Sequence, residues 1–147
     1  MGITITGASA IKKKLEKTGH QIKVSPKKLI KTVSEARNMV QKRTNKGQNA
    51  SGGSFQRLNP DYAEYKKGKG KRGVPDLHFE GNMLRAMQVK GITGGAEIYF
   101  NNEAERKKAY AHQYGRGVPK RSFFRLGKKI EKYIFDEFRK PIKKALK

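Results

Sequence analysis

The sequence contains no cysteine and no tryptophan, and only 12 of its 147 residues are acidic. Without cysteine, disulfides and thiolate metal sites are excluded, and nothing favours an oxidising compartment. An intracellular origin is therefore expected. No apolar run is long enough to cross a bilayer, and the first ten residues lack the basic start and apolar stretch of a signal peptide. We therefore expect no membrane partner.

Positive charge, in contrast, is present in large excess. The 35 lysines and arginines give a formal net charge of +23. Self-repulsion on this scale opposes compaction and is usually tolerated where an anionic partner is present. DNA, RNA and an acidic protein surface all meet this requirement, because the attraction between basic side chains and phosphate is independent of sequence. The charge alone therefore leaves the partner open.

The length of the chain matches one ordinary domain, and residues 1–147 are expected to form it. A hydrophobic fraction of 35% beside a charged fraction of 32% predicts one modest core, with part of the chain outside it. Aromatic residues near strand and helix junctions are expected to cover the sheet and not to form a ligand cage. They are Tyr99, Phe100, Tyr110, Tyr114, Phe123 and Phe124.

Two long helices are predicted from apolar spacing. Ser25 as N-cap and Pro26 in the first turn predict a helix over about 26–43, with an apolar stripe at spacings of four, three and four. A second amphipathic helix is predicted over about 127–146, kinked or divided at Pro141. Shorter helical segments are predicted at residues 10–17, from residue 59 onward, and at 82–87 and 103–114.

A hairpin is predicted where Val89–Ile92 and Ala96–Phe100 flank a glycine-rich turn. Between about residues 46 and 73 the chain is poor in apolar residues and rich in glycine and lysine, which predicts a long, flexible basic loop. The predicted fold class is therefore α+β. It has a small antiparallel sheet, packed by a long helix from the N-terminal half and by a C-terminal helix.

The sharpest catalytic candidate is Asp76-x-His78-x-Glu80. On an extended strand these side chains would point to the same side and could hold a divalent metal. Three residues are too few to define such a site, however, and no second carboxylate cluster supports a two-metal mechanism. His112 has no serine or aspartate at a recognisable spacing, so we interpret it as a structural histidine bonded to the backbone. We expect no enzyme activity, metal or cofactor.

The basic run at the end of the predicted loop is the best candidate for contact with a partner. Its members are Lys66, Lys67, Lys69, Lys71 and Arg72. A cationic loop can follow a phosphate backbone without base contacts, and Tyr62 and Tyr65 could stack on bases. The alternative is a loop that orders against an acidic protein. We favour the protein partner, because little base-reading machinery surrounds the run.

The second half of the chain also carries an ordered series of motifs. They are Phe55-x-x-Leu58-x-Pro60-x-Tyr62, Pro75-Asp76-Leu77, Gly81-x-x-Leu84, Ile98-x-Phe100, Tyr110-Ala111 with His112-Gln113-Tyr114-Gly115, and Val118-Pro119-x-Arg121-x-Phe123. Over about residues 55–146, this order resembles the virion-morphogenesis and tail-completion proteins of tailed bacteriophages. The block from Tyr110 to Phe124 is the most specific part. The chain departs from the family at His78, where a small hydroxyl residue is more usual.

The resemblance implies a structural virion protein without catalytic activity. It would be a subunit of a homo-oligomeric ring at the neck or head-proximal tail end, between the connector or adaptor and the tail terminator or tube. Double-stranded DNA would pass through its channel, and the host cytoplasm would hold the protein during assembly. The residues expected to fix the corner after the helix at 103–114 are His112, Gln113, Gly115, Pro119, Arg121 and Phe123. The alternative function is a small basic nucleic-acid-binding protein.

Overall fold

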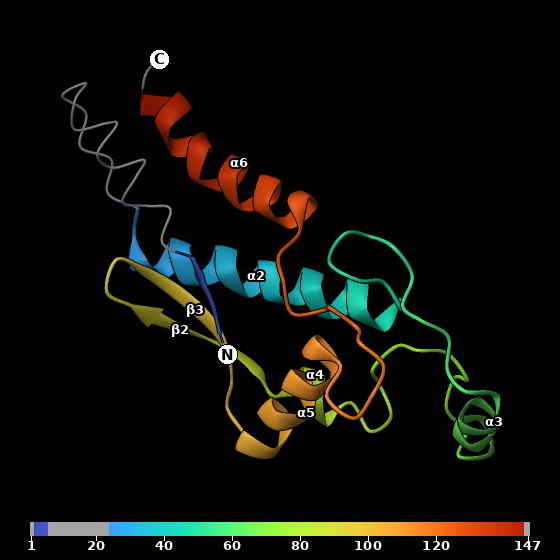
Figure 1. Ribbon diagram of the computed structural model, residues 1–147. Coiled ribbons are helices and arrows are strands. Elements are labelled where there is room, and N and C mark those ends of the chain that lie inside the picture. Colours follow the sequence, from blue (N-terminus) through green and yellow to red (C-terminus); the bar gives the residue numbers. More distant parts are fainter. Residues whose placement is uncertain (1, 6–23, 146–147) are drawn as a thin grey trace.

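The computed structural model describes residues 2–5 and 24–145 (Figure 1). The helix predicted at residues 10–17 lies outside these ranges. In the described parts the protein is α+β, as predicted, with a three-stranded antiparallel sheet and five helices. The helices are α2 (Pro26–Asn45), α3 (Pro60–Gly68), α4 (Asn82–Arg85), α5 (Glu103–Tyr114) and α6 (Lys128–Ala145).

The sheet consists of β1 (Ile3–Ile5), β2 (Met87–Ile92) and β3 (Gly95–Phe100), in the order β1-β3-β2. The predicted hairpin of β2 and β3 is confirmed, and Gly94 at its turn has a φ of +73°. β1 was not predicted as part of the sheet. It pairs with β3 across most of the chain, a contact that no local pattern can reveal.

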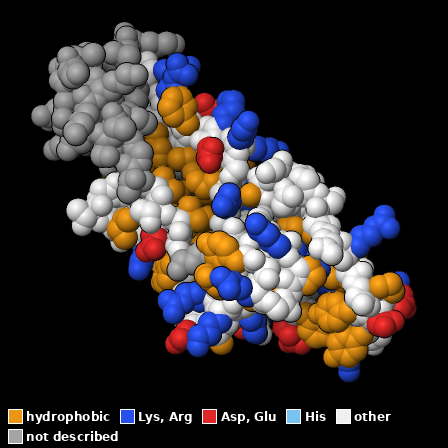
Figure 2. Space-filling view, in the orientation of Figure 1, with side chains coloured by type: hydrophobic (Ala, Val, Ile, Leu, Met, Phe, Trp, Pro, Cys, Tyr) orange, Lys and Arg blue, Asp and Glu red, His pale blue; other side chains and the backbone are white. Residues whose placement is uncertain are grey.

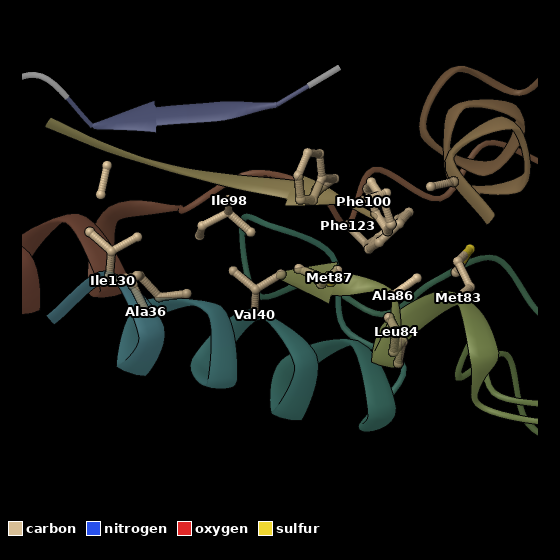
Figure 3. Close-up of a cluster of buried hydrophobic side chains, with 14 of the residues drawn as sticks. Ala36, Val40, Met83, Leu84, Ala86, Met87, Ile98, Phe100, Phe123 and Ile130 are labelled. Carbon is tan, nitrogen blue, oxygen red and sulfur yellow. The ribbon is translucent and has the colours of Figure 1, made fainter. Parts of the chain in front are cut away.

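Helix α2 packs against β2 and β3, and α6 packs against α2 (Figure 1). The N-cap of α2 is Ser25, whose side chain accepts a hydrogen bond from the backbone N–H of Lys28 at 3.2 Å. Figure 3 shows Val40 of α2 directed toward Met87 and Ile98 of the hairpin, and all three are fully buried. Alternation along β3 sends Ala96, Ile98 and Phe100 into this core.

Helix α6 completes the core with an apolar face that recurs every four residues. Ile130, Ile134 and Phe138 lie on this face, and each is no more than 7% exposed. Pro141 lies inside α6, so the helix is not divided there, whereas the predicted kink stays a prediction. No helix of the described residues is both long and apolar enough to span a membrane.

The segment that joins α5 to α6 is fastened to the end of α2 by Arg43. Its guanidinium donates hydrogen bonds to the backbone carbonyls of Phe123, Arg125 and Leu126, at 2.8, 2.6 and 2.7 Å. These carbonyls precede the first turn of α6, where Gly127 has a φ of +74°. The Arg43 side chain of α2 therefore binds the backbone of the segment that leads into α6.

The aromatic residues do not all enter the core. Phe123 and Phe124 are buried, and the ring of Phe124 lies 4.9 Å from that of Phe100. Tyr110 and Tyr114 are 45% and 49% exposed, so the prediction that they pack inside is wrong. The reason is helical periodicity: α5 buries positions 109 and 113, which places 110 and 114 on its outer face.

Residues 46–73 are not one continuous loop. A tight turn after α2 is closed by a bridge between Gln48 and Ser54, and the side chain of Asn49 accepts hydrogen bonds from the backbone of Ser51 and Gly53. Helix α3 then begins at Pro60, capped by Asn59. This helix lies apart from the sheet, at one end of the molecule (Figure 1).

Candidate functional site

A cleft of about 250 Å³ lies between α3, the segment that follows it, and α5. Tyr62 and Phe79 contribute to its walls, and Figure 2 shows apolar side chains gathered at the α3 end of the molecule. The ring of Tyr65 stacks between the other two, 6.1 Å from Tyr62 and 6.0 Å from Phe79. Tyr62 and Tyr65 are about half exposed, at 45% and 53%. An aromatic row thus leads from the cleft to the surface.

One wall of the cleft is held by a buried ion pair. The Nζ of Lys66 lies 2.8 Å from Oδ1 of Asp76, and both side chains are 3% exposed. Lys66 also donates to the carbonyl of Val74 at 3.0 Å. Asp76 accepts further bonds from the guanidinium of Arg72 at 3.0 Å and from the backbone N–H of His78 at 3.1 Å. This network ties the segment after α3 back onto the helix.

Two opposing effects act on the pKa of Asp76. Burial raises it, but hydrogen bonds from Lys66, from the His78 backbone and from Arg72 outweigh burial and hold the pKa below its ordinary value. The carboxylate is therefore ionised at neutral pH and balances the charge of Lys66.

Lys66 is consequently not a surface contact, and this part of the sequence prediction is wrong. The local sequence carries no signal of this burial, because the partner Asp76 lies ten residues further along the chain. Arg72 is also engaged with Asp76, and Lys67 pairs with Glu64 at 2.7 Å on the exposed side.

Lys69 and Lys71 remain as candidates for contact with a partner. In the described part of the chain neither of them has a carboxylate partner, although the Nζ of Lys69 lies 5.8 Å from the centre of the Tyr65 ring. Both lysines follow the end of α3 at Gly68, and Lys69 lies beside the aromatic row.

Asp76, His78 and Glu80 do not form a metal site. Leu77 has a φ of +53°, which breaks the extended alternation that would have aligned the three side chains. Asp76 turns inward to Lys66, whereas His78 and Glu80 are exposed. No group of three or more histidine or carboxylate side chains suited to a metal occurs within residues 2–5 and 24–145.

The corner after α5 brings most of its predicted residues together. The side chain of Gln113 is buried and accepts a hydrogen bond from the backbone N–H of Phe124 at 2.9 Å. Gly115 ends α5 in the left-handed region, with a φ of +73°. Phe123 is fully buried, whereas Pro119 is exposed. The corner is thus fixed mainly by Gln113, Gly115 and Phe123.

His112 and Arg121 belong to the same corner but face the cleft. The backbone N–H of Arg121 donates to the carbonyl of His112 at 2.7 Å. The imidazole Nδ1 of His112 is buried and has no hydrogen-bond partner in the part of the chain that the structure describes, so this atom does not make the predicted bond to the backbone. Burial lowers the pKa of His112, and the charge of Arg121 lowers it further, so the ring is mainly neutral at pH 7.

Arg121 is only 5% exposed, and its Nε has no acceptor within the described residues. Burial lowers its pKa, an effect that the nearby Tyr62 hydroxyl partly opposes. Glu105 also lines the cleft: its Oε1 accepts a hydrogen bond from Lys108 at 2.8 Å, while its Oε2 is buried and has no donor among the described residues. Sequence reasoning missed Glu105, because an acidic residue in the first turn of a helix is ordinary.

Arg121 and Glu105 line one small cleft beside exposed aromatic rings, and within the described residues Nε of Arg121 and Oε2 of Glu105 have no hydrogen-bond partner. Comparisons with protein-family models, with curated proteins and with solved structures gave no match.

Proposed function

We propose that this chain is a structural virion protein of a tailed bacteriophage, of the tail-completion kind. In this role it joins the head connector to the tail as one subunit of a ring around the DNA channel. The observation that carries the proposal is the Tyr110–Phe124 block. The residues of this most specific motif fold into one connected corner, with Gln113 bonded to Phe124 and Phe123 in the core.

The position of α3 supports an assembly role. The helix lies apart from the sheet (Figure 1), and it exposes Tyr62 and Tyr65 to solvent. Exposed aromatic side chains that lie together are typical of surfaces that become buried against another protein. Such a projecting helix suits a subunit that makes its main contacts in an assembly.

The charge of +23 supports a position beside anionic material. Packaged duplex DNA carries about one negative charge per 1.7 Å of its axis, so a basic subunit at the channel is electrostatically favoured. The same charge is also compatible with free nucleic-acid binding, which the experiments below separate from a place in the virion.

The direct test is to purify phage particles from the producing strain on a density gradient and to quantify this chain against the major capsid protein by mass spectrometry. A ring component is expected at a few to about a dozen copies per particle, because closed rings of one subunit type have fixed small numbers of members. If the chain is absent from intact particles, the proposal fails.

A pair of substitutions that removes two positive charges, Lys69→Ser with Lys71→Ser, tests whether the end of α3 takes part in joining. Both lysines lack carboxylate partners in the described ranges, so the fold should persist while tails fail to attach to filled heads. The matched control is Lys128→Ser with Lys129→Ser, which removes the same charge from the exposed start of α6.

Duplex DNA titrations on the same variants separate the two functions. If the run after α3 binds DNA, the slope of log affinity against log salt falls by about 2 for the Lys69/Lys71 variant, since each phosphate contact contributes about 0.9. Normal head–tail joining by this variant, together with such a change of slope, would favour the nucleic-acid-binding alternative.

A further inference from the structure

Arg121 is the least compensated charge that faces the cleft. Its side chain is 95% buried, and its guanidinium makes neither a hydrogen bond nor an ion pair within residues 2–5 and 24–145. The two lysines of the cleft already have carboxylate partners, Asp76 for Lys66 and Glu105 for Lys108. A buried cation without an acceptor opposes folding, so it favours any partner that brings one.

Among the described residues, Oε2 of Glu105 lacks a hydrogen-bond donor, whereas Nε of Arg121 lacks an acceptor. Glu105 lines the same cleft, and its buried Oε2 accepts no hydrogen bond from residues 2–5 and 24–145. An occupant that satisfies both groups must present an anionic oxygen to Arg121 and a hydrogen-bond donor to Glu105. A phosphodiester of a nucleic-acid backbone carries no donor, and the carboxylate of Glu105 would repel any phosphate. A polypeptide supplies both, through an acidic side chain and its own backbone.

The shape of the cleft points to the same class of occupant. A volume of about 250 Å³ holds one side chain and a short stretch of backbone. A DNA duplex is too wide to enter such a cleft, so its phosphates cannot reach the buried guanidinium. At the mouth, Tyr62, Tyr65 and Phe79 offer a stacked aromatic surface to a neighbouring apolar side chain.

Charge decides between a second copy of this chain and a different protein. A second copy offers only 12 acidic residues beside 35 basic ones, so few of its segments could present an uncompensated carboxylate to this cleft, whatever contacts other surfaces make in a ring. An acidic protein is attracted by the net charge of +23, which also raises its rate of association.

We infer that the cleft is a docking site for an acidic segment of a partner protein. One glutamate or aspartate of the segment pairs with Arg121, its backbone donates to Glu105, and an adjacent apolar side chain packs on the aromatic row of α3. The cleft would keep this role whether or not the chain belongs to a virion.

The test follows the Nε–H resonance of Arg121 by NMR in the full-length, ¹⁵N-labelled chain. The probes are the capped tripeptide acetyl-Gly-Glu-Phe-amide and its glutamine counterpart. The glutamate peptide is expected to shift the resonance saturably, with a Kd of about 1–10 mM, because it forms one charge-assisted contact and one aromatic contact. The glutamine peptide should bind at least about tenfold more weakly.

Two variants sharpen the result, with binding followed on the backbone amides that line the cleft. Arg121→Met removes the charge but keeps an unbranched side chain, and it should weaken the glutamate peptide by about tenfold or more. Arg116→Gln removes one charge from an exposed position of the same corner, and it should leave the Kd within about twofold. If Arg121→Met does not fold, the two peptides on the unaltered chain still decide the question.

Three outcomes would overturn the inference. Equal binding of both peptides, or no shift at all, shows that no carboxylate is recognised. A response of the Arg121 resonance to inorganic phosphate or duplex DNA but not to the glutamate peptide assigns the cleft to phosphate. If Glu105→Gln moves the resonance of the peptide-free chain as far as the peptide does, Arg121 is already paired with Glu105.

Discussion

Replacing Asp76 with alanine is expected to lower the free energy of unfolding by about 3–5 kcal/mol. The substitution leaves Lys66 3% exposed with no carboxylate beside it, and an uncompensated buried charge is among the costliest single defects in a protein. Urea denaturation at pH 7 measures the loss. Hydrogen exchange of the α3 amides shows whether that helix detaches before the rest of the chain unfolds.

Two controls separate burial from the mere loss of an ion pair. Glu64→Ala breaks the exposed pair with Lys67 and should cost less than about 1 kcal/mol. The double variant Lys66→Met with Asp76→Leu removes both buried charges together and should recover most of the stability lost in Asp76→Ala. Equal costs for Asp76→Ala and Glu64→Ala would contradict the buried placement of the pair.

The pH dependence of the same pair has a definite sign. The pKa of Asp76 is lower in the folded protein than in the unfolded chain, so the carboxylate stabilises the fold above its ordinary pKa of about 3.9. This contribution declines as the pH falls through the folded pKa. The unaltered protein should therefore lose stability in acid more steeply than the Asp76→Ala variant.

Gly127→Ala is expected to lower the free energy of unfolding by about 3 kcal/mol or more. A Cβ at this position would overlap the carbonyl oxygen of Ala50, and the backbone has a φ of +74°, which side chains other than glycine's rarely adopt. Relief would require moving the turn after α2 away from the start of α6. Thermal and chemical denaturation measure the cost.

Gly117→Ala is the matched control. Its φ of +71° is nearly the same, but no atom lies within 4 Å of the added Cβ. It should therefore show the backbone strain alone, about 1–2 kcal/mol. A difference of less than about 0.5 kcal/mol between the two variants would mean that Ala50 does not press on Gly127.

Local patterns predicted the parts of the fold that short-range physics determines. α5 was predicted with its observed ends from its helix-forming residues and from Gly115, which closes its last turn, and the structure adds Asn102 as the cap of its first turn. The hairpin followed from apolar segments around a glycine turn. The error at Tyr110 and Tyr114 arose because both residues are aromatic, and the choice of buried face depended on small Ala109 and polar Gln113.

The site was less predictable, because its members meet only through tertiary structure. Arg121 and His112 were expected to fix a corner, yet their side chains face a cleft whose other walls come from α3 and the segment after it. In the sequence Lys66 is one of five similar basic residues, and only the folded structure shows that Asp76, ten residues later, lies beside it. Glu105 gains its interest only from the absence of a donor at Oε2 in the described structure.

The guanidinium of Arg43 has a consequence for how the molecule comes apart. Its three acceptors lie 80 to 83 residues further along the chain, so these bonds form only after a long loop has closed. Conversely, α6 cannot leave α2 by fraying alone, since the approach to it must first release a half-buried charge. A force applied to the C-terminal helix would therefore be transmitted directly to the end of α2, and the two helices should behave as one mechanical unit.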